Sequence, residues 1–521
     1  MKLMHLKSGT DVRGVAVATE KYPEIQLTDD VVKYISKSFI KFLSEKTSKA
    51  YSDLLVSVGH DSRISADRIR NAVIEAVGEM GVNILNCSYC STPAMFMTTV
   101  TRECDGAIQI TASHHPFDRN GLKFFTRDGG LSGDELKSIL ADAENEPKDK
   151  AEKNGTIIEI DYISEYAQIL RNMIKKGVNA EDYDKPLKNF KIAVDAGNGV
   201  GGFYATKVLA PLGADVSASQ FLEPDGMFPN HIPNPENKVA MEYIRNATIN
   251  NNCDLGVIFD TDVDRASCVD EKGDEINRNS IVALASVIAL EGNEGGSIVT
   301  DSVTSDGLRE FIEDTLGGKH IRFKRGYKNV IDEAIRRTSE GENTPLAIET
   351  SGHAAFKENY YLDDGAYLIT KIIIKAAVLR KEGKKIGDCI KSLKKPLEEK
   401  ELRFNITADN FREIGEKLIE EIKVIAEKDD DMILAPDNYE GVRVSFADES
   451  KKGWFLLRLS VHDPVMPFNT ESDVEGGCIE ICKVFYELVK NVKDIDFTRV
   501  KYQWHPMDKS ETQPIEMIEV K

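Results

Sequence analysis

The segment AIQITASHHPFDRNGLKFF, residues 107–125, starts as a short apolar run and continues into a loop of serine, histidine and basic side chains. A run of this length, bounded by polar residues, is typical of a buried strand. The arrangement occurs twice more, where LGVIF (255–259) leads into DTDVDR and PLAI (345–348) leads into ETSGH. A different polar motif thus follows each of three similar strands.

Each of these strands is the third of three apolar runs in a block. The runs are Leu54–Val58, Val82–Leu85 and Ala107–Ile110 in the first block, Lys191–Val194, Ala214–Val216 and Leu255–Phe259 in the second, and Ser297–Val299, His320–Phe323 and Pro345–Ile348 in the third. Segments with helical spacing, such as ADRIRNAVIEAVGEM (66–80) and SDGLREFIEDTL (305–316), lie between them. Strands that alternate with helices predict α/β domains with mixed or parallel sheets, which bind ligands at the carboxyl ends of their strands.

The pattern changes near residue 400. Strand-like runs GVRVSF (441–446) and GWFLLRLSV (453–461) then alternate with helix-like segments at 410–428 and 477–492, which predicts an α+β domain. We therefore expect three similar α/β domains and a C-terminal α+β domain around a central cleft. The expected domain ranges are 1–187, 188–293, 294–398 and 399–521.

The composition restricts the possible partners. A formal charge of −20 argues against binding to nucleic acid or to an anionic membrane. The N-terminus lacks the apolar core of a signal peptide, and the longest apolar run (281–290) is too short to span a bilayer, so we expect a cytoplasmic protein. Eight cysteines are too few for a disulfide scaffold, and the C-x-x-C of Cys87 and Cys90 lacks the second pair of a zinc site.

The DTDVDR motif offers carboxylates at Asp260, Asp262 and Asp264. Alternate residues point the same way in an extended segment, and oxygen-only ligands suit Mg²⁺ or Ca²⁺. An EF-hand is disfavoured because Arg265 stands where the loop needs glycine, although Glu271 fits its twelfth position. An aspartate-nucleophile phosphatase and simple capping of the next helix remain open.

The TASHHP motif places Ser113 after a strand, as a nucleophile would be. A serine-histidine triad is not supported, because the glycines of G-x-S-x-G are absent and adjacent histidines do not face each other. Ser113 taken alone is equally consistent with a loop or helix-capping residue. A serine, a divalent-cation site and cations such as Lys123 and Arg265 suit phosphoryl transfer, with Ser113 carrying the phosphoryl group.

Seven motifs, in order, resemble the α-D-phosphohexomutase family, which includes phosphoglucomutase, phosphomannomutase and phosphoglucosamine mutase. They are SGTDVRG (8–14), VGHDSR (58–63), TASHHPFDRNGLK (111–123), DAGNGVGG (195–202), EPDGMFPNHIPNPE (223–236), DTDVDR (260–265) and ETSGH (349–353). Each motif is weak alone, but their ordered combination over essentially the whole chain is specific.

The resemblance implies four domains that carry, in order, a phosphoserine loop, a metal site, a sugar-binding loop and a phosphate-binding loop. It also implies conversion of hexose 6-phosphate and 1-phosphate through phosphoserine and a 1,6-bisphosphate, which acts as an activator. The implied catalytic residues are Ser113, Lys123, His353, Arg13 and Arg265. The implied substrate-binding residues are Glu349, Ser351, Arg63, Lys328, Arg458 and Ser460. The implied ligands of Mg²⁺ are Asp260, Asp262, Asp264 and a phosphate oxygen on Ser113.

Three departures from the family pattern stand out. His115 replaces a common asparagine, and KRGYK (324–328) matches only loosely, which leaves the roles of Arg325 and Lys328 open. RLSVHDP (458–464) replaces R-x-S-G-T-E-P: Val461, His462 and Asp463 differ, and Pro467 stands near the place of a second arginine.

Several functions are compatible with these residues. We expect a mutase that accepts glucose and mannose phosphates, because no motif reads the 2-hydroxyl. Alternatives are a phosphoglucosamine mutase, a phosphosugar phosphatase built on Asp260 and a non-catalytic phosphosugar-binding protein. The expected partner is a phosphorylated hexose, and the chain is expected to be a monomer or a homodimer.

Overall fold

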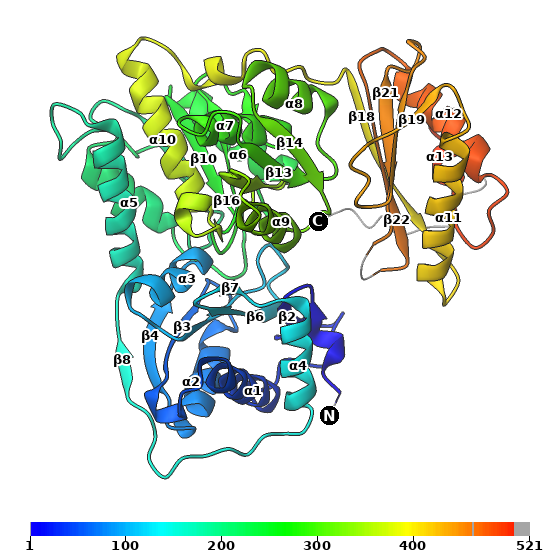
Figure 1. Ribbon diagram of the computed structural model, residues 1–521. Coiled ribbons are helices and arrows are strands. Elements are labelled where there is room, and N and C mark those ends of the chain that lie inside the picture. The colour runs from blue at the N-terminus through cyan, green and yellow to red at the C-terminus, as the bar shows by residue number, and fades with distance from the viewer. Residues whose placement is uncertain (1, 461–462, 505–521) are drawn as a thin grey trace. The chain divides into compact units, whose positions relative to one another are not determined.

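The computed structural model describes residues 2–460 and 463–504, which fold into two compact units (Figure 1). Unit 1 contains the residues up to 291 together with 345–391. Unit 2 contains residues 292–344 together with the described residues from 392 onward. The third predicted block is therefore divided between the two units.

The first block of unit 1 forms a mixed sheet with strand order β1-β2-β6-β5-β3-β4-β8, and β7 pairs with β6. Strands β5, β3, β4 and β8 run parallel, whereas β6 runs antiparallel to both β5 and β2. The strands are β1 (Lys7–Ser8), β2 (Asp11–Val15), β3 (Leu55–His60), β4 (Asn83–Tyr89), β5 (Gly106–Ile110), β6 (Arg119–Thr126), β7 (Gly129–Gly130) and β8 (Ile157–Glu159). The polar loop between β5 and β6 contains Ser113, and Lys123 lies opposite Gln109.

Helices cover both faces of this sheet. They are α1 (Asp29–Thr47), α2 (Ala66–Glu79), α3 (Thr92–Thr101), α4 (Gly133–Ala143) and α5 (Tyr162–Val178), with 3-10 turns at Met4–Leu6 and Tyr51–Asp53. Residues of α1, α2 and α4 share one hydrophobic core with the strands, in which Phe39 packs on Phe124 at 4.6 Å. Helix α3 packs against β3, β5 and β6 from the opposite face (Figure 1). Ser91 caps the start of α3 by accepting from the Ala94 amide.

The second block adds a four-stranded sheet of order β12-β11-β10-β9 to unit 1. Its elements are β9 (Ile192–Asp195), β10 (Leu255–Phe259), β11 (Ala266–Asp270), β12 (Glu275–Ile276), α6 (Lys238–Asn250), α7 (Asn279–Leu290), a π-helix at Tyr204–Leu209 and a 3-10 turn at Ala210–Leu212. The predicted strand Ala214–Val216 is wrong. Only an isolated bridge joins Asp215 to Lys191, and the Asp215 carboxylate accepts from the Ser217 amide, which turns the chain away.

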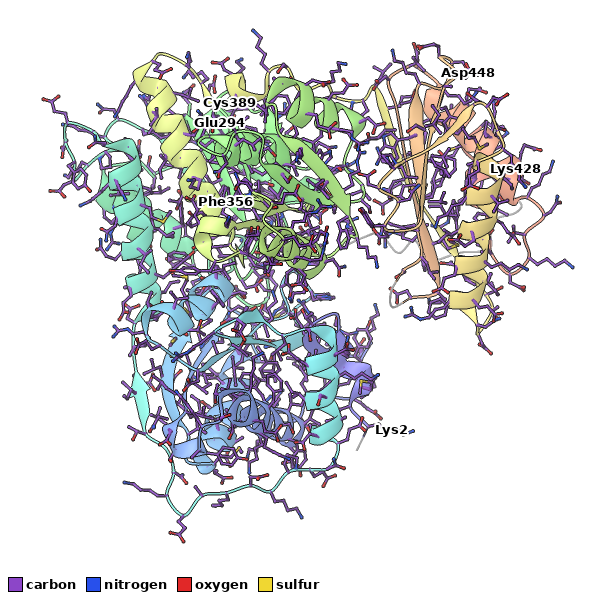
Figure 2. All side chains as sticks on the ribbon, in the orientation of Figure 1. Lys2, Glu294, Phe356, Cys389, Lys428 and Asp448 are labelled. Carbon is purple, nitrogen blue, oxygen red and sulfur yellow. The ribbon has the colours of Figure 1, made fainter. Side chains whose placement is uncertain are left out.

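The last part of unit 1 places a short antiparallel sheet before a long helix. The elements are β15 (Leu346–Ile348), β16 (Ala354–Phe356), β17 (Leu362–Asp363), α10 (Gly365–Lys381) and 3-10 turns at Lys357–Asn359 and Ile386–Ile390. Phe356 is buried and packs on Tyr367 of α10, at 5.4 Å between ring centroids (Figure 2).

Unit 2 combines a parallel strand pair with an antiparallel sheet of order β18-β22-β21-β20-β19. Its elements are β13 (Ser297–Asp301), α8 (Asp306–Glu310) with a π-helical continuation (Phe311–Thr315), β14 (Lys319–Phe323), α9 (Tyr327–Ser339), β18 (Glu398–Asn405), α11 (Phe411–Ala426), β19 (Met432–Leu434), β20 (Val442–Phe446), β21 (Gly453–Leu457), β22 (Val465–Ser472), α12 (Gly477–Val489) and α13 (Thr498–Lys501). Phenylalanines from the sheet and α12 form its core, while Lys428 and Asp448 extend outward (Figure 2).

The predicted fold class is confirmed: α/β blocks with mixed sheets precede a C-terminal antiparallel α+β domain. The boundaries at 187, 293 and 398 stay predictions. Within 2–460 and 463–504, every helix is too short or too polar to cross a bilayer.

Candidate active site

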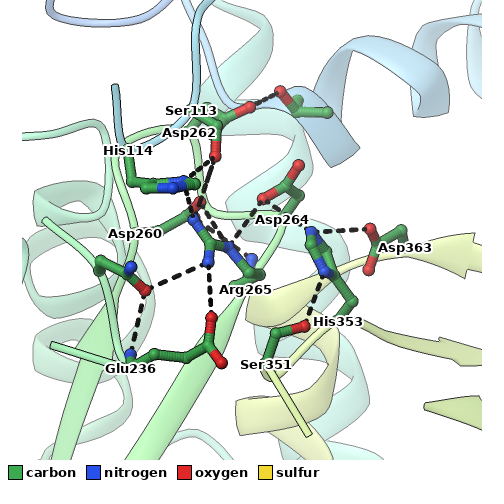
Figure 3. A network of polar contacts seen from close by, with 12 residues as sticks. Ser113, His114, Glu236, Asp260, Asp262, Asp264, Arg265, Ser351, His353 and Asp363 are labelled. Atoms are coloured by element: carbon green, nitrogen blue, oxygen red, sulfur yellow. Dashed lines mark hydrogen bonds and ion pairs between the residues drawn. The ribbon is translucent and has the colours of Figure 1, made fainter. Parts of the chain in front are cut away.

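Ser113 occupies the loop after β5 in a left-handed backbone conformation, with φ = 50°. Its hydroxyl lies 3.2 Å from Asp260 Oδ2 and 3.3 Å from Nδ1 of His114, and accepts from Arg265 Nη2 at 3.1 Å (Figure 3). A residue other than glycine adopts this conformation only when its surroundings impose it. Ser113 is therefore held with its hydroxyl between a carboxylate and a guanidinium.

Hydrogen bonds to the loop backbone hold this conformation. The Thr111 hydroxyl accepts from the Ser113 amide at 2.9 Å and donates to Asp61 Oδ2 at 2.7 Å. Arg13, on β2, donates to the Ala112 carbonyl at 2.5 Å. The SGTDVRG and VGHDSR motifs thus both support the loop between β5 and β6 that carries Ser113, called the serine loop below.

Arg63, which was predicted to bind substrate, contacts the serine loop. None of its side chain is exposed, and its Nε lies 3.2 Å from Asp61 Oδ2. The guanidinium donates to four backbone carbonyls of the loop, those of Ser113, His115, Pro116 and Arg119. Because its described contacts are with protein, we interpret Arg63 as a residue that holds the serine loop in its conformation.

The three aspartates of DTDVDR follow β10 and converge as the motif predicted. Asp260, Asp262 and Asp264 each offer an oxygen within 4.8 Å of the others, and their side chains are buried. Asp262 Oδ2 accepts from the Thr92 hydroxyl at the start of α3, while Asp262 Oδ1 is buried without a hydrogen-bond partner in the described part of the chain. This oxygen-only group could hold a metal ion.

Lys123 and Arg265 supply positive charge to these aspartates. Lys123 Nζ contacts Asp264 Oδ2 and lies 3.8 Å from Asp262 Oδ2, and Arg265 Nε lies 3.2 Å from Asp260 Oδ2. Burial and the neighbouring carboxylates raise the pKa of Asp260 and of Asp262. Burial also acts to raise the pKa of Asp264, but Lys123, His353 and Arg265 outweigh it and hold that pKa far below its ordinary value. A divalent cation would relieve the remaining repulsion.

The ETSGH motif reaches the same place, because His353 forms an isolated β-bridge with Arg265. His353 Nδ1 lies 3.1 Å from Ser351 Oγ, and Nε2 lies 3.5 Å from Asp363 Oδ2 (Figure 3). Nδ1 also lies 3.3 Å from Glu349 Oε2. Burial acts to lower the pKa of His353, but Asp363, Glu349 and Asp264 outweigh it and raise the pKa to about 9. The surrounding carboxylates therefore favour the protonated form of the imidazole.

Four residues of this network were not assigned from the sequence. Asp61 lay inside a recognised motif, whereas Thr92 and Asp363 had no sequence signal. Asn234, in the EPDGMFPNHIPNPE motif, accepts from Arg265 Nη1 at 3.1 Å. The same loop is fixed by His231, whose Nε2 lies 3.0 Å from Asp195 Oδ1. This contact connects the two second-domain motifs.

The remaining predicted residues lie in unit 2. Lys328, on α9, forms an ion pair with Asp332. Arg458 is mostly buried, with Nη1 3.9 Å from Glu440 Oε1, and Ser460 Oγ accepts from the Asp463 amide at 3.3 Å.

The Arg325 amide donates to Glu440 Oε2 at 3.0 Å. Val461 and His462 lie outside the described residues, so the altered RLSVHDP loop stays a sequence-based interpretation at those positions.

Comparison with known proteins supports the arrangement of motifs. Three phosphoglucomutase/phosphomannomutase α/β/α domains match the chain: domain I at residues 5–150, domain II at 164–273 and domain III at 277–396. A phosphoglucomutase of Neisseria gonorrhoeae is 28% identical over 92% of this chain and 96% of its own length. A phosphomannomutase of Escherichia coli is 29% identical over 86% of this chain and 92% of its own length.

Solved structures show the same fold. A phosphoglucomutase/phosphomannomutase family protein of Burkholderia thailandensis superposes with a TM-score of 0.76 at 24% identity, covering 95% of this chain and 98% of that one. A phosphomannomutase-like protein of Thermus thermophilus gives a TM-score of 0.68 at 18% identity, over 93% and 98% of the two chains. The fold and the site define an enzyme that transfers phosphoryl groups and acts as an isomerase. The chain belongs to the phosphoglucomutase/phosphomannomutase family.

Replacing Arg63 by lysine tests whether it positions Ser113. Lysine keeps the charge but cannot reach four carbonyls, so the loop should shift. We expect kcat to fall by ~10–10²-fold, since a misplacement of about 1 Å costs up to ~10²-fold. The Kd of glucose 1-phosphate for the unphosphorylated protein, measured by calorimetry, should stay nearly constant.

Arg68→Lys is the matched control, because Arg68 also donates to backbone carbonyls, those of Ala16 and Leu27, but away from the serine loop. It should leave kcat unchanged. A Kd for glucose 1-phosphate that weakens in proportion to the loss of activity in Arg63→Lys would instead restore Arg63 as a substrate ligand.

Proposed function

We propose that this enzyme interconverts hexose 1-phosphates and hexose 6-phosphates, with glucose and mannose as sugars. One observation carries the proposal: Ser113 Oγ lies between Asp260 Oδ2 and Arg265 Nη2, beside a group of carboxylates that could hold a metal ion. The named activities of the family relatives support the same reaction class. The supporting arrangement combines a carrier hydroxyl, a cation site and fixed positive charge in unit 1.

The proposed cycle starts with phosphoserine at Ser113. A hydroxyl of the bound hexose phosphate attacks the phosphorus, a new P–O bond forms to the sugar, and the bond to Ser113 Oγ breaks. The sugar hydroxyl gives up its proton and Ser113 Oγ takes one, so that a hexose 1,6-bisphosphate and free serine result. The bisphosphate then reorients in the site, and its other phosphoryl group is transferred to Ser113 by the same chemistry. Added hexose 1,6-bisphosphate would activate by phosphorylating Ser113.

Mg²⁺ fits the residues that would hold it. Asp260, Asp262 and Asp264 supply only oxygen, and Asp262 Oδ1 is a buried acceptor with no hydrogen-bond partner among the described residues. Bound there, the cation would neutralise charge on the transferring phosphoryl group. Arg265 and Lys123 would bind its other oxygens, and Arg13 would keep the Ala112 carbonyl in place.

Lys123 and His353 are the proposed proton-transfer residues. The protonated His353 has its ring fixed on one side by Ser351 and Glu349 and on the other by Asp363. It is therefore suited to donate a proton to the leaving oxygen. Lys123 contacts Asp264 Oδ2 and, in its neutral amine form, would receive the proton of the attacking hydroxyl.

Binding of the rest of the substrate is assigned by resemblance. Glu349 and Ser351 would hold the sugar's 3- and 4-hydroxyls, and Arg458, Ser460 and Lys328 would hold the distal phosphate. The proposed substrate is anionic although the chain carries a formal charge of −20. Mg²⁺ at the three aspartates, together with Lys123 and Arg265, would provide the local positive charge, since screening removes distant charges beyond ~10 Å.

A phosphatase that uses Asp260 as nucleophile is the second candidate. Both Asp260 oxygens are engaged: Oδ1 accepts from the Arg265 amide at 3.2 Å, and Oδ2 faces Arg265 Nε and the Ser113 hydroxyl. Asp260 is thus oriented by Arg265 toward the Ser113 hydroxyl, as expected of a carboxylate beside the phosphoryl carrier, and release of inorganic phosphate without isomerised product would favour the phosphatase.

Replacement of Ser113 by alanine should abolish the mutase reaction while leaving the fold intact. The reason is that the hydroxyl is the proposed carrier and its loss leaves the backbone contacts of the loop in place. A coupled assay should show no product, and intact mass should show phosphate on the native protein after treatment with glucose 1,6-bisphosphate but not on the variant. Full turnover by the variant would exclude the proposed cycle.

Activity should require a divalent cation. Chelation should stop turnover and added Mg²⁺ should restore it. Asp262→Asn should raise the Mg²⁺ concentration for half-maximal activity by at least ~10²-fold, since loss of an outer partner alone costs 10–100-fold. Asp270→Asn is the control, because this buried carboxylate lies on β11 and caps its own turn. Undiminished turnover in excess chelator would show that the three aspartates have a structural role and bind no catalytic metal.

Glucose and mannose phosphates should both turn over, because the proposed sugar-binding residues do not read the hydroxyl at which these sugars differ. We expect kcat/KM values within ~10²-fold, or about 3 kcal/mol of transition-state binding. N-acetylglucosamine phosphates should react more slowly because of their bulky 2-substituent. A difference in kcat/KM above ~10³-fold between the two epimers would show that a residue recognises the 2-hydroxyl, and would contradict this expectation.

A further inference from the structure

Asp363, at the end of β17, points one carboxylate oxygen at His353 without a hydrogen bond between them. Its Oδ1 accepts from the Ala354 amide at 3.1 Å, which fixes the carboxylate. Its Oδ2 is buried, has no hydrogen-bond partner in the described parts of the chain, and lies 3.5 Å from His353 Nε2. The side chain is nine-tenths buried. Solvent therefore does little to stabilise the negative charge on this oxygen.

Asp264 presents a second oxygen of the same kind to the same nitrogen. Its Oδ2 faces Lys123, on the side of Asp262. Its Oδ1 is buried, has no hydrogen-bond partner within the described residues, and lies 3.7 Å from His353 Nε2. Asp264 thus contacts Lys123 through Oδ2 and faces His353 through Oδ1, which also lies 4.0 Å from Arg265 Nε.

The spacing of these atoms matches the ligands of one small metal ion. Separations of 3.5 and 3.7 Å exceed the usual length of an N–H···O hydrogen bond. Ligands bound tetrahedrally to Zn²⁺ at 2.0–2.2 Å lie about 3.4 Å apart. Asp264, His353 and Asp363 all offer donor atoms within 4.8 Å of one another.

The other side of the His353 ring has the partners that metal-bound histidines usually have. Glu349 Oε2 and Ser351 Oγ lie 3.3 and 3.1 Å from Nδ1. A carboxylate at this nitrogen fixes the ring and its tautomer, which leaves the other nitrogen for the metal.

The backbone holds the ligand-bearing segments close together. The Glu349 amide donates to the His353 carbonyl at 2.9 Å, and the Gly365 amide, next to β17, donates to the Val263 carbonyl at 3.1 Å. Gly352 has φ = 93°, and a Cβ there would lie 2.5 Å from the Ala266 carbonyl oxygen. The three ligands therefore stand on a fixed frame.

We propose that Asp264, His353 and Asp363 form a second metal site that binds a transition metal of the Zn²⁺ class. An imidazole nitrogen with two carboxylates favours such an ion over Mg²⁺, which prefers oxygen ligands. Three protein ligands leave one position open. Asp264 would serve both sites, with Oδ2 toward the Mg²⁺ group and Oδ1 toward the new ion.

Occupation of this site has a regulatory consequence that rests on the proposed function. A metal on His353 Nε2 replaces the proton that the imidazole would give to the leaving oxygen. Zn²⁺ therefore inhibits turnover without displacing Mg²⁺ from the aspartates of DTDVDR. Binding of the ion itself does not depend on the reaction.

Titration of the full chain with Co²⁺ in saturating Mg²⁺ tests the site directly. We expect one equivalent of Co²⁺ to bind with the intense visible absorption of a four-coordinate ion, and Zn²⁺ to remove that absorption. Asp363→Asn and His353→Gln should lose it. Asp262→Asn is the matched variant, because it removes a ligand of the Mg²⁺ group alone and should keep the absorption. Thermal melting of each variant identifies loss of fold.

Two results would overturn the proposal. One is a lack of four-coordinate Co²⁺ absorption in the native chain, and the other is full absorption in a folded Asp363→Asn variant.

Turnover is measured separately as Zn²⁺ is added at constant Mg²⁺. Unchanged turnover with Zn²⁺ bound would overturn both the inhibition and the proton-donor role of His353. It would leave the metal site itself unaffected, because the Co²⁺ spectra alone decide whether that site exists.

Discussion

Three aspartate side chains buried within reach of one another constrain everything around them. At an effective dielectric constant of about 20, two unit charges 4 Å apart repel by about 4 kcal/mol. Three such pairs approach the whole stability margin of a typical domain, about 5–15 kcal/mol. Asp260, Asp262 and Asp264 therefore require nearby positive charge. Arg265 follows them in the chain, Lys123 comes from β6, and His353 comes from the loop after β15. This requirement explains why motifs distant in sequence meet at one place.

The serine loop needs stabilising contacts of its own, because Ser113 has a backbone conformation that serine seldom adopts. The carbonyls that point inward around this turn would be unsatisfied if they were buried without donors. Arg63 donates to four of them and is itself neutralised by Asp61. Arg63, predicted from family resemblance to bind substrate, thus also supports the loop. The serine hydroxyl can then face the aspartates without moving.

The sequence predicted most of the fold because strand and helix periods are local properties. The runs Leu255–Phe259 and Ala107–Ile110 were recognisable as strands, and the polar residues after them converge in the structure. Ala214–Val216 was wrong because a side-chain hydrogen bond of Asp215 turns the chain, which hydrophobicity does not record. Thr92 and Asp363 could not be predicted, because their importance depends on contacts with Asp262 and His353 that only the folded chain creates.

The central claim is that the phosphoryl group in the product comes from Ser113. The most direct measurement is a single turnover of enzyme phosphorylated at Ser113 with isotopically labelled phosphate, mixed with unlabelled glucose 1-phosphate and analysed by mass spectrometry. The label should appear on the 6-position of the sugar, and the substrate's own phosphate should then be found on Ser113. Label that is released as inorganic phosphate, or that stays on the enzyme while glucose 6-phosphate forms, would contradict it.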